Sequence, residues 1–194
     1  MYSGLLRADV IWIDSLMAFP VQHAPITSAG TRYSLHHLQP FTIKLDGKGK
    51  DGLDLTVRIS FHSHVYSKVD SDDATGHRFV DEGGKWREFC TDRYALCLGL
   101  PSICTEMVIR NFPSWESRDG GKKNNMTVSE AVPTSGLKYL IFYQLVPSLA
   151  DGVDVELVVK SAYEREFLAE RTGKRLGVQT LLRTVLFKGT KLPK

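Results

Sequence analysis

Hydrophobic and polar residues alternate most regularly over residues 53–66, and this pattern predicts a β-strand with one face in the core. The expected core positions are Leu53, Leu55, Val57, Ile59, Phe61 and Val65. The opposite face is expected to carry Arg58, His62, His64, Tyr66 and Lys68. We predict that this is the longest strand of the protein and that Leu157 and Val159, from a later strand, join the same core.

Three hairpins are predicted by pairs of β-prone segments. The paired segments are residues 41–45 with 53–68, 77–81 with 85–90, and 137–146 with 153–163. Short turns containing glycine join the members of each pair, which favours antiparallel pairing. Residues 113–136 are instead rich in Ser, Gly, Lys, Asn and Pro, and they predict a mobile surface loop.

Apolar residues at helical spacing predict short helices elsewhere. One such stripe runs from Arg93 to Val108, where Pro101 is expected to divide it into two helices. Residues 178–187 fit a helix better than a last strand, and Gly189 is placed to end that helix. The expected fold class is therefore α+β, with an antiparallel β-sheet of about five or six strands and one to three helices.

Length and composition are those of one soluble domain. The chain has 194 residues, of which 42% are apolar and 24% are charged. We expect residues 1–40 to form an N-terminal extension packed on or linked to the domain, and residues 41–194 to form a single α+β domain. No apolar run approaches the roughly 20 residues that span a bilayer, and Arg7, Asp9 and Asp14 interrupt any signal-peptide core. These features indicate a cytoplasmic protein with no membrane partner.

The cysteine pattern and the absence of standard catalytic motifs limit the reaction types that the sequence supports. Cys90, Cys97 and Cys104 are odd in number and include no CxxC pair, so we expect reduced, mostly buried thiols. The sequence contains no P-loop, HExxH, GxSxG or EF-hand pattern. The nucleophile elbow of α/β-hydrolases is therefore not expected, and the sequence implies no cofactor.

Charge is unevenly distributed along the chain. The sequence contains 25 Lys and Arg against 22 Asp and Glu, yet no acidic residue follows Glu170. Residues 171–194 carry seven of the basic residues and a formal charge of +7, whereas the preceding part carries −4. A one-sign end of this kind suits a polyanion such as RNA, with Lys174, Arg175 and Arg183 as the predicted contacts, although it is also typical of a solubilising surface.

The most concentrated candidate chemistry lies on the polar side of residues 61–68. Imidazole moves protons near neutral pH, and Lys or Arg stabilises the charge that develops on a phosphoryl oxygen. RNA cleavage through its own 2′-hydroxyl needs a base, an acid and a cation, without a metal. We therefore assign His62 or His64 as base or acid. The cations would be Lys68, Arg58 and Arg165, the last at the end of a predicted strand.

Two other interpretations of these residues stay open. The histidines are also compatible with a solvent-facing strand of a non-enzymatic module that binds protein or nucleic acid. Alternatively, His62 and His64 point the same way on a strand and could share a metal ion. A third ligand would then come from His77, Asp81 or Cys90 on a neighbouring strand.

The order of these segments resembles a poorly characterised bacterial family, over about residues 40–190. Its members are often labelled stationary-phase growth adaptation proteins, and many are found on plasmids or prophages. The residues that carry the resemblance are 61–68, 81–93 with Arg87-Glu88-Phe89-Cys90, 139–145 and 155–165. The layout is also distantly similar to the barnase/EndoU/colicin E5/RelE class of small RNases, in which helices precede a four-stranded antiparallel sheet.

The resemblance to small RNases is one of architecture, and it implies RNA as a partner and, for a toxin-like protein, a protein partner or antitoxin. The leading hypothesis is therefore a small metal-independent ribonuclease or toxin-like RNA-acting protein. The alternatives are the non-enzymatic binding module and a metal-dependent enzyme using the His62/His64 pair.

Overall fold

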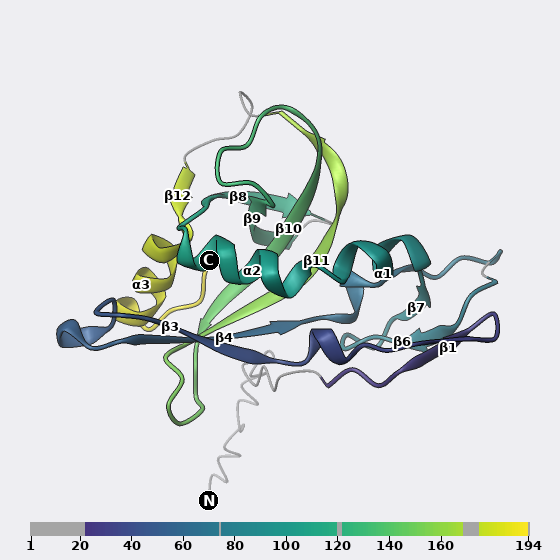
Figure 1. Cartoon of the computed structure of the whole chain (residues 1–194), viewed down its shortest axis with the longest axis horizontal. Helices are drawn as coiled ribbons and strands as arrows, with labels where there is room; N and C mark the ends of the chain where they lie inside the picture. Colours follow the sequence, from purple (N-terminus) through teal and green to yellow (C-terminus); the bar gives the residue numbers. More distant parts are fainter. Residues whose placement is uncertain (1–21, 74, 120–121, 169–174, 194) are drawn as a thin grey trace, which may run out of the picture.

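The computed structural model describes residues 22–73, 75–119, 122–168 and 175–193, and it shows an α+β fold (Figure 1). Seven strands form the main sheet of this part of the chain. Their order across the sheet is β12 (Arg175–Gly177), β8 (Pro113–Asp119), β9 (Lys122–Val128), β10 (Gly136–Pro147), β11 (Val155–Phe167), β4 (Leu55–Phe61) and β3 (Phe41–Leu45). The three expected hairpins are present.

The main sheet is mixed, so the predicted antiparallel sheet of five or six strands is wrong in both strand number and direction. Strands β11 and β4 run parallel, with Leu157 opposite Ile59. Between them the chain passes through a small sheet, two helices and strands β8, β9 and β10. Parallel neighbours require a long connection of this kind, and local alternation in the sequence gives no sign of it.

The predicted mobile loop over residues 113–136 is wrong for most of its length, because β8 and β9 form a hairpin within the main sheet. Several buried side chains of this hairpin are polar: Ser114, Asn124, Asn125 and Thr127. Ser114 Oγ donates to the Met126 carbonyl at 3.0 Å, and Thr127 Oγ1 donates to the Pro113 carbonyl at 2.8 Å. Hydrogen bonds across the hairpin thus satisfy buried polar groups, and the sequence lacks the hydrophobic alternation that marks an ordinary strand.

Most of the core lies where the sequence places it, but Leu53 is exposed and Tyr66 is buried, contrary to the prediction. The predicted longest strand is also wrong. Leu55, Val57, Ile59, Phe61, Leu157 and Val159 are all completely buried, as predicted. Strand β4 nevertheless has seven residues, against 13 in β11 and 12 in β10. Beyond Phe61 the chain leaves the sheet and turns into the 3₁₀ helix η3 (Ser63–Val65). The alternation of apolar and polar residues therefore continues to residue 66, although the strand ends at Phe61.

Two small sheets and two further 3₁₀ helices complete the strand-rich part. The two-stranded sheet contains β1 (Ile26–Ser28) and β2 (Thr31–Tyr33), and the three-stranded sheet contains β5 (Ser67–Val69), β7 (Trp86–Phe89) and β6 (Arg78–Val80). The 3₁₀ helices are η1 (His36–Leu38) and η2 (Lys50–Gly52). Leu35 and Leu38 are buried in the same core as β4, so η1 and the residue before it pack against that core.

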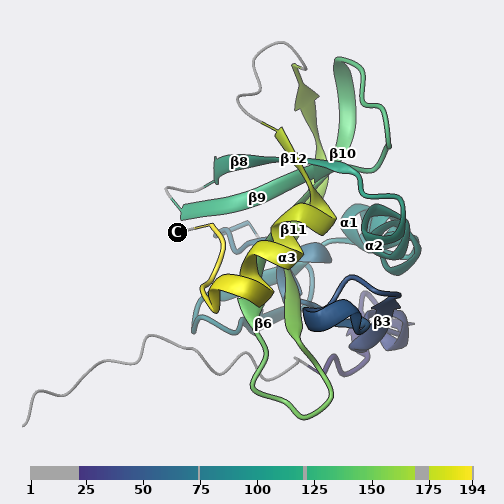
Figure 2. The same cartoon turned by 90° about the vertical axis from the view of Figure 1, so that its left-hand side faces the viewer.

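Three α-helices are present in the described residues: α1 (Thr91–Cys97), α2 (Leu100–Ile109) and α3 (Val178–Lys188). Pro101 lies in the first turn of α2, which confirms the predicted division. Gly189 ends α3 with a left-handed backbone, as predicted. Figure 2 shows α3 lying over β10 and β11, beside α2. None of these helices is long and apolar enough to cross a membrane.

The three cysteines are free thiols, and Cys97 and Cys104 are fully buried, whereas Cys90 is half-buried. Burial raises the pKa of the Cys97 thiol to about 12. Because the thiolate is the reactive form, we expect a maleimide to label Cys97 and Cys104 at least about tenfold more slowly than Cys90. Mass spectrometry during native labelling measures the three rates, and denaturant should make them similar. Equal native rates would contradict the burial seen here.

Candidate functional site

His62 and His64 are brought together by the turn that follows β4. The His62 backbone N–H donates to the Val159 carbonyl at 2.9 Å, which holds His62 against β11. The 3₁₀ turn then places the His64 ring beside that of His62. Their centroids lie 6.5 Å apart, with the ring planes at 90°. The two imidazoles are therefore neighbours because the chain turns, and the single strand face predicted for them is wrong.

Each imidazole has a carboxylate partner from the turn between β6 and β7. His64 Nε2 lies 2.8 Å from Asp81 Oδ2, and His62 Nδ1 lies 3.4 Å from Glu82 Oε2. Backbone N–H groups of Gly83 and Lys85 donate to Asp81 Oδ1 at 2.9 and 2.8 Å. Residues distant in the sequence thus form two His–carboxylate pairs.

Ser63 fixes the second of these carboxylates. Its backbone N–H donates to Glu82 Oε1 at 2.6 Å, and its hydroxyl donates to Oε2 at 2.8 Å. The contact ties the β6–β7 turn to the first residue of η3. Hydrogen bonds between these two segments therefore hold the imidazoles and the carboxylates in one rigid cluster.

The electrostatic environment keeps the two carboxyls ionised and His64 uncharged. Burial opposes ionisation of Glu82, but the contacts with His62 and the Ser63 N–H outweigh it and lower the pKa of this carboxyl. The pKa of Asp81 is also lowered, because hydrogen bonds from Lys85, His64 and Gly83 outweigh burial. Burial lowers the pKa of His64, although Asp81 opposes the shift. At neutral pH the carboxyls are therefore ionised, and His64 is a neutral imidazole.

Lys160 supplies a cation beside the imidazoles through an irregularity in β11. The pairing of β10 with β11 changes from Phe142 opposite Ser161 to Tyr143 opposite Val159, which leaves Lys160 in a β-bulge. Such bulges often redirect a side chain near a functional site. Lys160 Nζ lies 2.9 Å from His62 Nε2 and 3.2 Å from His62 Nδ1.

Two arginines, Arg93 and Arg87, form hydrogen bonds with the chain between His64 and Ser67. Arg93 Nη1 donates to the carbonyls of His64 and Ser67 at 3.1 and 2.7 Å, and its guanidinium lies 5.1 Å above the Tyr163 ring. Arg87 is buried and donates to Ser67 Oγ at 3.1 Å. Both groups support the chain from His64 to Ser67, and Arg87 also adds positive charge near Asp81 and Glu82.

The other predicted catalytic residues do not join this cluster. Arg58 Nη2 lies 2.6 Å from Glu156 Oε1, and Lys68 Nζ lies 3.0 Å from Glu88 Oε2. Arg165 is exposed on β11 opposite Lys138, roughly 16 Å along the strand from Lys160. Lys160 is the cation that the sequence analysis missed. The alternation in the sequence places Lys160 on the same polar face as Glu156, which marks it as a candidate. The bulge that directs it toward His62 has no signal in the sequence.

A pocket of about 380 Å³ opens beside the cluster. Ser63, Asp81 and Glu82 form its side toward the imidazoles. Much of the remaining lining is aromatic, from His23, Tyr66, His77 and Phe79. The rings of His77 and Phe79 are stacked, with centroids 6.2 Å apart. The cluster therefore adjoins a cavity with a largely aromatic lining.

Comparison of the sequence with known protein families assigns it to one of them. It matches the YjaZ family over residues 25–186. The chain is a member of this family. No curated protein and no solved structure matches it. For this YjaZ-family chain, the expected mobile-element origin and the likeness to small RNases therefore stay expectations.

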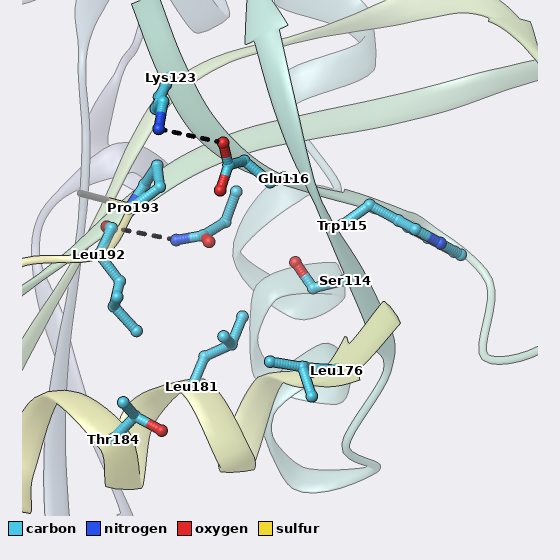
Figure 3. Close-up of a pocket in the computed structure, with 10 residues that line it drawn as sticks. Ser114, Trp115, Glu116, Lys123, Leu176, Leu181, Thr184, Leu192 and Pro193 are labelled. Carbon is cyan, nitrogen blue, oxygen red and sulfur yellow. Dashed lines mark hydrogen bonds and ion pairs between the residues drawn. The ribbon is translucent and has the colours of Figure 1, made fainter. Parts of the chain in front are cut away.

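A second pocket, of about 490 Å³, lies between β8, β9, α3 and the C-terminal segment (Figure 3). Leu176, Leu181 and Leu192 supply apolar surface, and Lys123 and Glu116 form an ion pair at 3.4 Å. None of its described lining residues is a histidine. It thus lacks the acid–base groups of the imidazole cluster.

The predicted nucleic-acid contacts lie at the opposite end of the long axis from β6 and β7 (Figure 1). Arg175 in β12 and Arg183 in α3 are exposed, and the Arg183 guanidinium lies 5.7 Å above the Phe187 ring. Lys174 lies outside the described residues. Any polyanion that contacts both this end and the imidazole cluster must therefore extend along the molecule.

One group in the described residues could hold a metal ion. His64, Asp81 and Glu82 each offer a ligand atom, and these atoms lie within 4.8 Å of one another. The set includes one member of the predicted His62/His64 pair and one of the predicted third ligands, Asp81. Glu82 lies in a Gly-rich turn, where no sequence pattern indicates a ligand.

Proposed function

We propose that the chain cleaves RNA by metal-independent acid–base catalysis, with His62 and His64 as the proton-transferring groups and Lys160 as the cation. One observation carries the proposal: two imidazoles 6.5 Å apart, each beside its own carboxylate, with an ammonium group in contact with one of them. A base, an acid and a cation are the parts that cleavage through the 2′-hydroxyl requires.

The proposed reaction uses the two imidazoles in turn. One takes the proton of the 2′-hydroxyl, and the freed oxygen attacks phosphorus to give a 2′,3′-cyclic phosphate. The other gives a proton to the departing 5′-oxygen. An incoming phosphate draws Lys160 away from His62, which leaves a His62 ring nitrogen available and places the ammonium on the developing charge.

The aromatic pocket supports RNA as the substrate. Proteins that bind unpaired nucleotides stack the bases on aromatic side chains. His77 and Phe79 present such a surface beside Asp81 and Glu82, whose oxygens can accept hydrogen bonds from a base. In this proposal the protein acts on RNA in the cytoplasm, and a toxin-like role would add a protein antitoxin as partner.

Arg58 and Lys68 are weaker candidates for the cation than Lys160. Each is paired with a carboxylate whose side chain is only 5% exposed, at Glu156 and Glu88 respectively. Moving either cation to a phosphate would leave a buried charge without its partner, which is costly. Lys160 contacts an imidazole that the proposed reaction uses.

The direct test is cleavage of a defined RNA by the full chain in EDTA. We expect products with 2′,3′-cyclic phosphate and 5′-hydroxyl ends. Lys160→Ala should lower the rate by about 10²-fold or more, because it removes the cation from the developing charge. Lys44→Ala removes an exposed lysine of β3 and serves as the control. Cleavage that requires added Mg²⁺, or equal loss in both variants, would contradict the proposal.

The basic end of the chain should contribute affinity for long RNA. Arg175→Ala/Arg183→Ala is expected to weaken binding and to make its salt dependence shallower, by about 0.7 in log–log slope for each phosphate that is no longer neutralised. Lys44→Ala/Lys48→Ala makes the same change in net charge on exposed lysines elsewhere. Filter binding at several salt concentrations measures both. Similar slopes for the two double variants would show that the basic end is only a solubilising surface.

A further inference from the structure

His64, Asp81 and Glu82 also form an arrangement suited to a metal ion, which is a property separate from proton transfer. Their ligand atoms lie within 4.8 Å of one another, and one imidazole with two carboxylates is a ligand set that Zn²⁺ accepts. We propose that these three side chains bind Zn²⁺ and that the bound ion switches off the acid–base site. The binding step stands alone, whereas the switching step rests on the proposed function.

The ligands are held in place by hydrogen bonds from surrounding groups. Asp81 Oδ1 is occupied by the Gly83 and Lys85 N–H groups, so Oδ2 faces His64. Ser63 holds both oxygens of Glu82. A carboxylate oxygen has a second lone-pair site and can keep such a bond while it coordinates an ion. Outer contacts of this kind orient metal ligands and strengthen binding.

Charge and access also fit a divalent cation. Asp81 and Glu82 provide two negative charges that balance the ion. The Asp81 side chain is 2% exposed, but those of Glu82 and His64 are 19% and 35% exposed. Ser63, Asp81 and Glu82 line the 380 Å³ pocket, which gives the ion a route from solvent. Three protein ligands leave one tetrahedral position for water or a phosphate oxygen.

The chemistry of the ligands selects the ion. Mg²⁺ and Ca²⁺ prefer oxygen ligands, whereas imidazole nitrogen favours Zn²⁺ and neighbouring transition metals. An ion between His64 and Asp81 takes up the ring nitrogen that now faces the carboxylate. With the ion on Nε2 the ring proton lies on Nδ1, so His64 has no free nitrogen that can accept a proton. One of the two imidazoles needed for RNA cleavage is thereby removed.

Calorimetric titration of the metal-free full chain with Zn²⁺ tests the binding step. We expect one ion per chain, and no comparable binding of Mg²⁺. His64→Ala and Glu82→Gln should each weaken binding by at least about tenfold. The amide in Glu82→Gln keeps an oxygen acceptor for Ser63, so this variant tests the ligand with little change in the turn. His36→Ala, an exposed imidazole in η1, is the control. The absence of saturable binding, or an equal loss in the control, would overturn the site.

RNA cleavage with and without Zn²⁺ tests the switching step. Each rate is expressed relative to the same variant in EDTA. Zn²⁺ should inhibit the wild type reversibly, and Glu82→Gln should need at least about ten times more Zn²⁺ for the same inhibition. Full cleavage by the Zn²⁺-saturated wild type would overturn the switch. If no variant cleaves RNA even in EDTA, the proposed function fails, and with it the switch, while calorimetry still decides whether Zn²⁺ binds.

Discussion

Replacing His62 with alanine should slow RNA cleavage in EDTA by about 10²–10⁴-fold, the usual contribution of a positioned acid or base. His62 is the imidazole that contacts both Lys160 and Glu82. Its loss removes one proton-transferring group and also the contact that directs the ammonium. Single-turnover rates on a short RNA measure the effect without a contribution from product release.

The same experiment separates a catalytic role from a structural one. His62→Ala/His64→Ala should be hardly slower than either single variant, because a base and an acid that act in one reaction have strongly non-additive effects. His36→Ala lies outside the cluster and should match the wild type. Thermal unfolding of each variant shows whether the fold persists. A His62→Ala variant that is folded and within about threefold of the wild-type rate would exclude this imidazole from catalysis.

Local patterns predicted much of the fold. The alternation in β4 and the predicted hairpins required only neighbouring residues, and Pro101 and Gly189 mark helix ends through their own backbone preferences. The parallel pairing of β4 with β11 depends instead on residues about a hundred positions apart. The β8–β9 hairpin was missed for a different reason, since its buried Ser114 and Thr127 look like loop residues until their hydrogen-bond partners are known.

In the candidate site, too, some residues could be predicted from the local sequence and others could not. The concentration of imidazoles at His62 and His64 is visible in the sequence, because both lie in one short segment. Their partners are not, because Glu82 comes from another hairpin and Lys160 is directed by a bulge in a third. Arg58 shows the converse error. A cation on a predicted polar face looks available for a phosphate, but parallel pairing places it opposite Glu156.

Arg58 should therefore matter for stability, and we expect Arg58→Leu to lower the free energy of unfolding by about 3 kcal/mol. The Glu156 side chain is 5% exposed and accepts hydrogen bonds from Arg58 Nε and Nη2 at 2.9 and 2.6 Å. Ser148 Oγ donates to it as well, at 2.6 Å. Without Arg58 the buried carboxylate keeps the Ser148 hydroxyl but has no guanidinium to balance its charge. Urea unfolding measures the loss.

Two further variants show whether this cost belongs to the isolated charge. Arg58→Leu/Glu156→Leu should regain most of the stability, because removing both members of a buried pair avoids the unpaired carboxylate. Arg110→Ala breaks an ion pair with Glu106 in which both side chains are more than half exposed, and it should cost no more than about 0.5 kcal/mol. If Arg58→Leu is as mild as Arg110→Ala, the Arg58–Glu156 pair does not stabilise the sheet. Arg58 would then be available for a phosphate, as the sequence alone suggests.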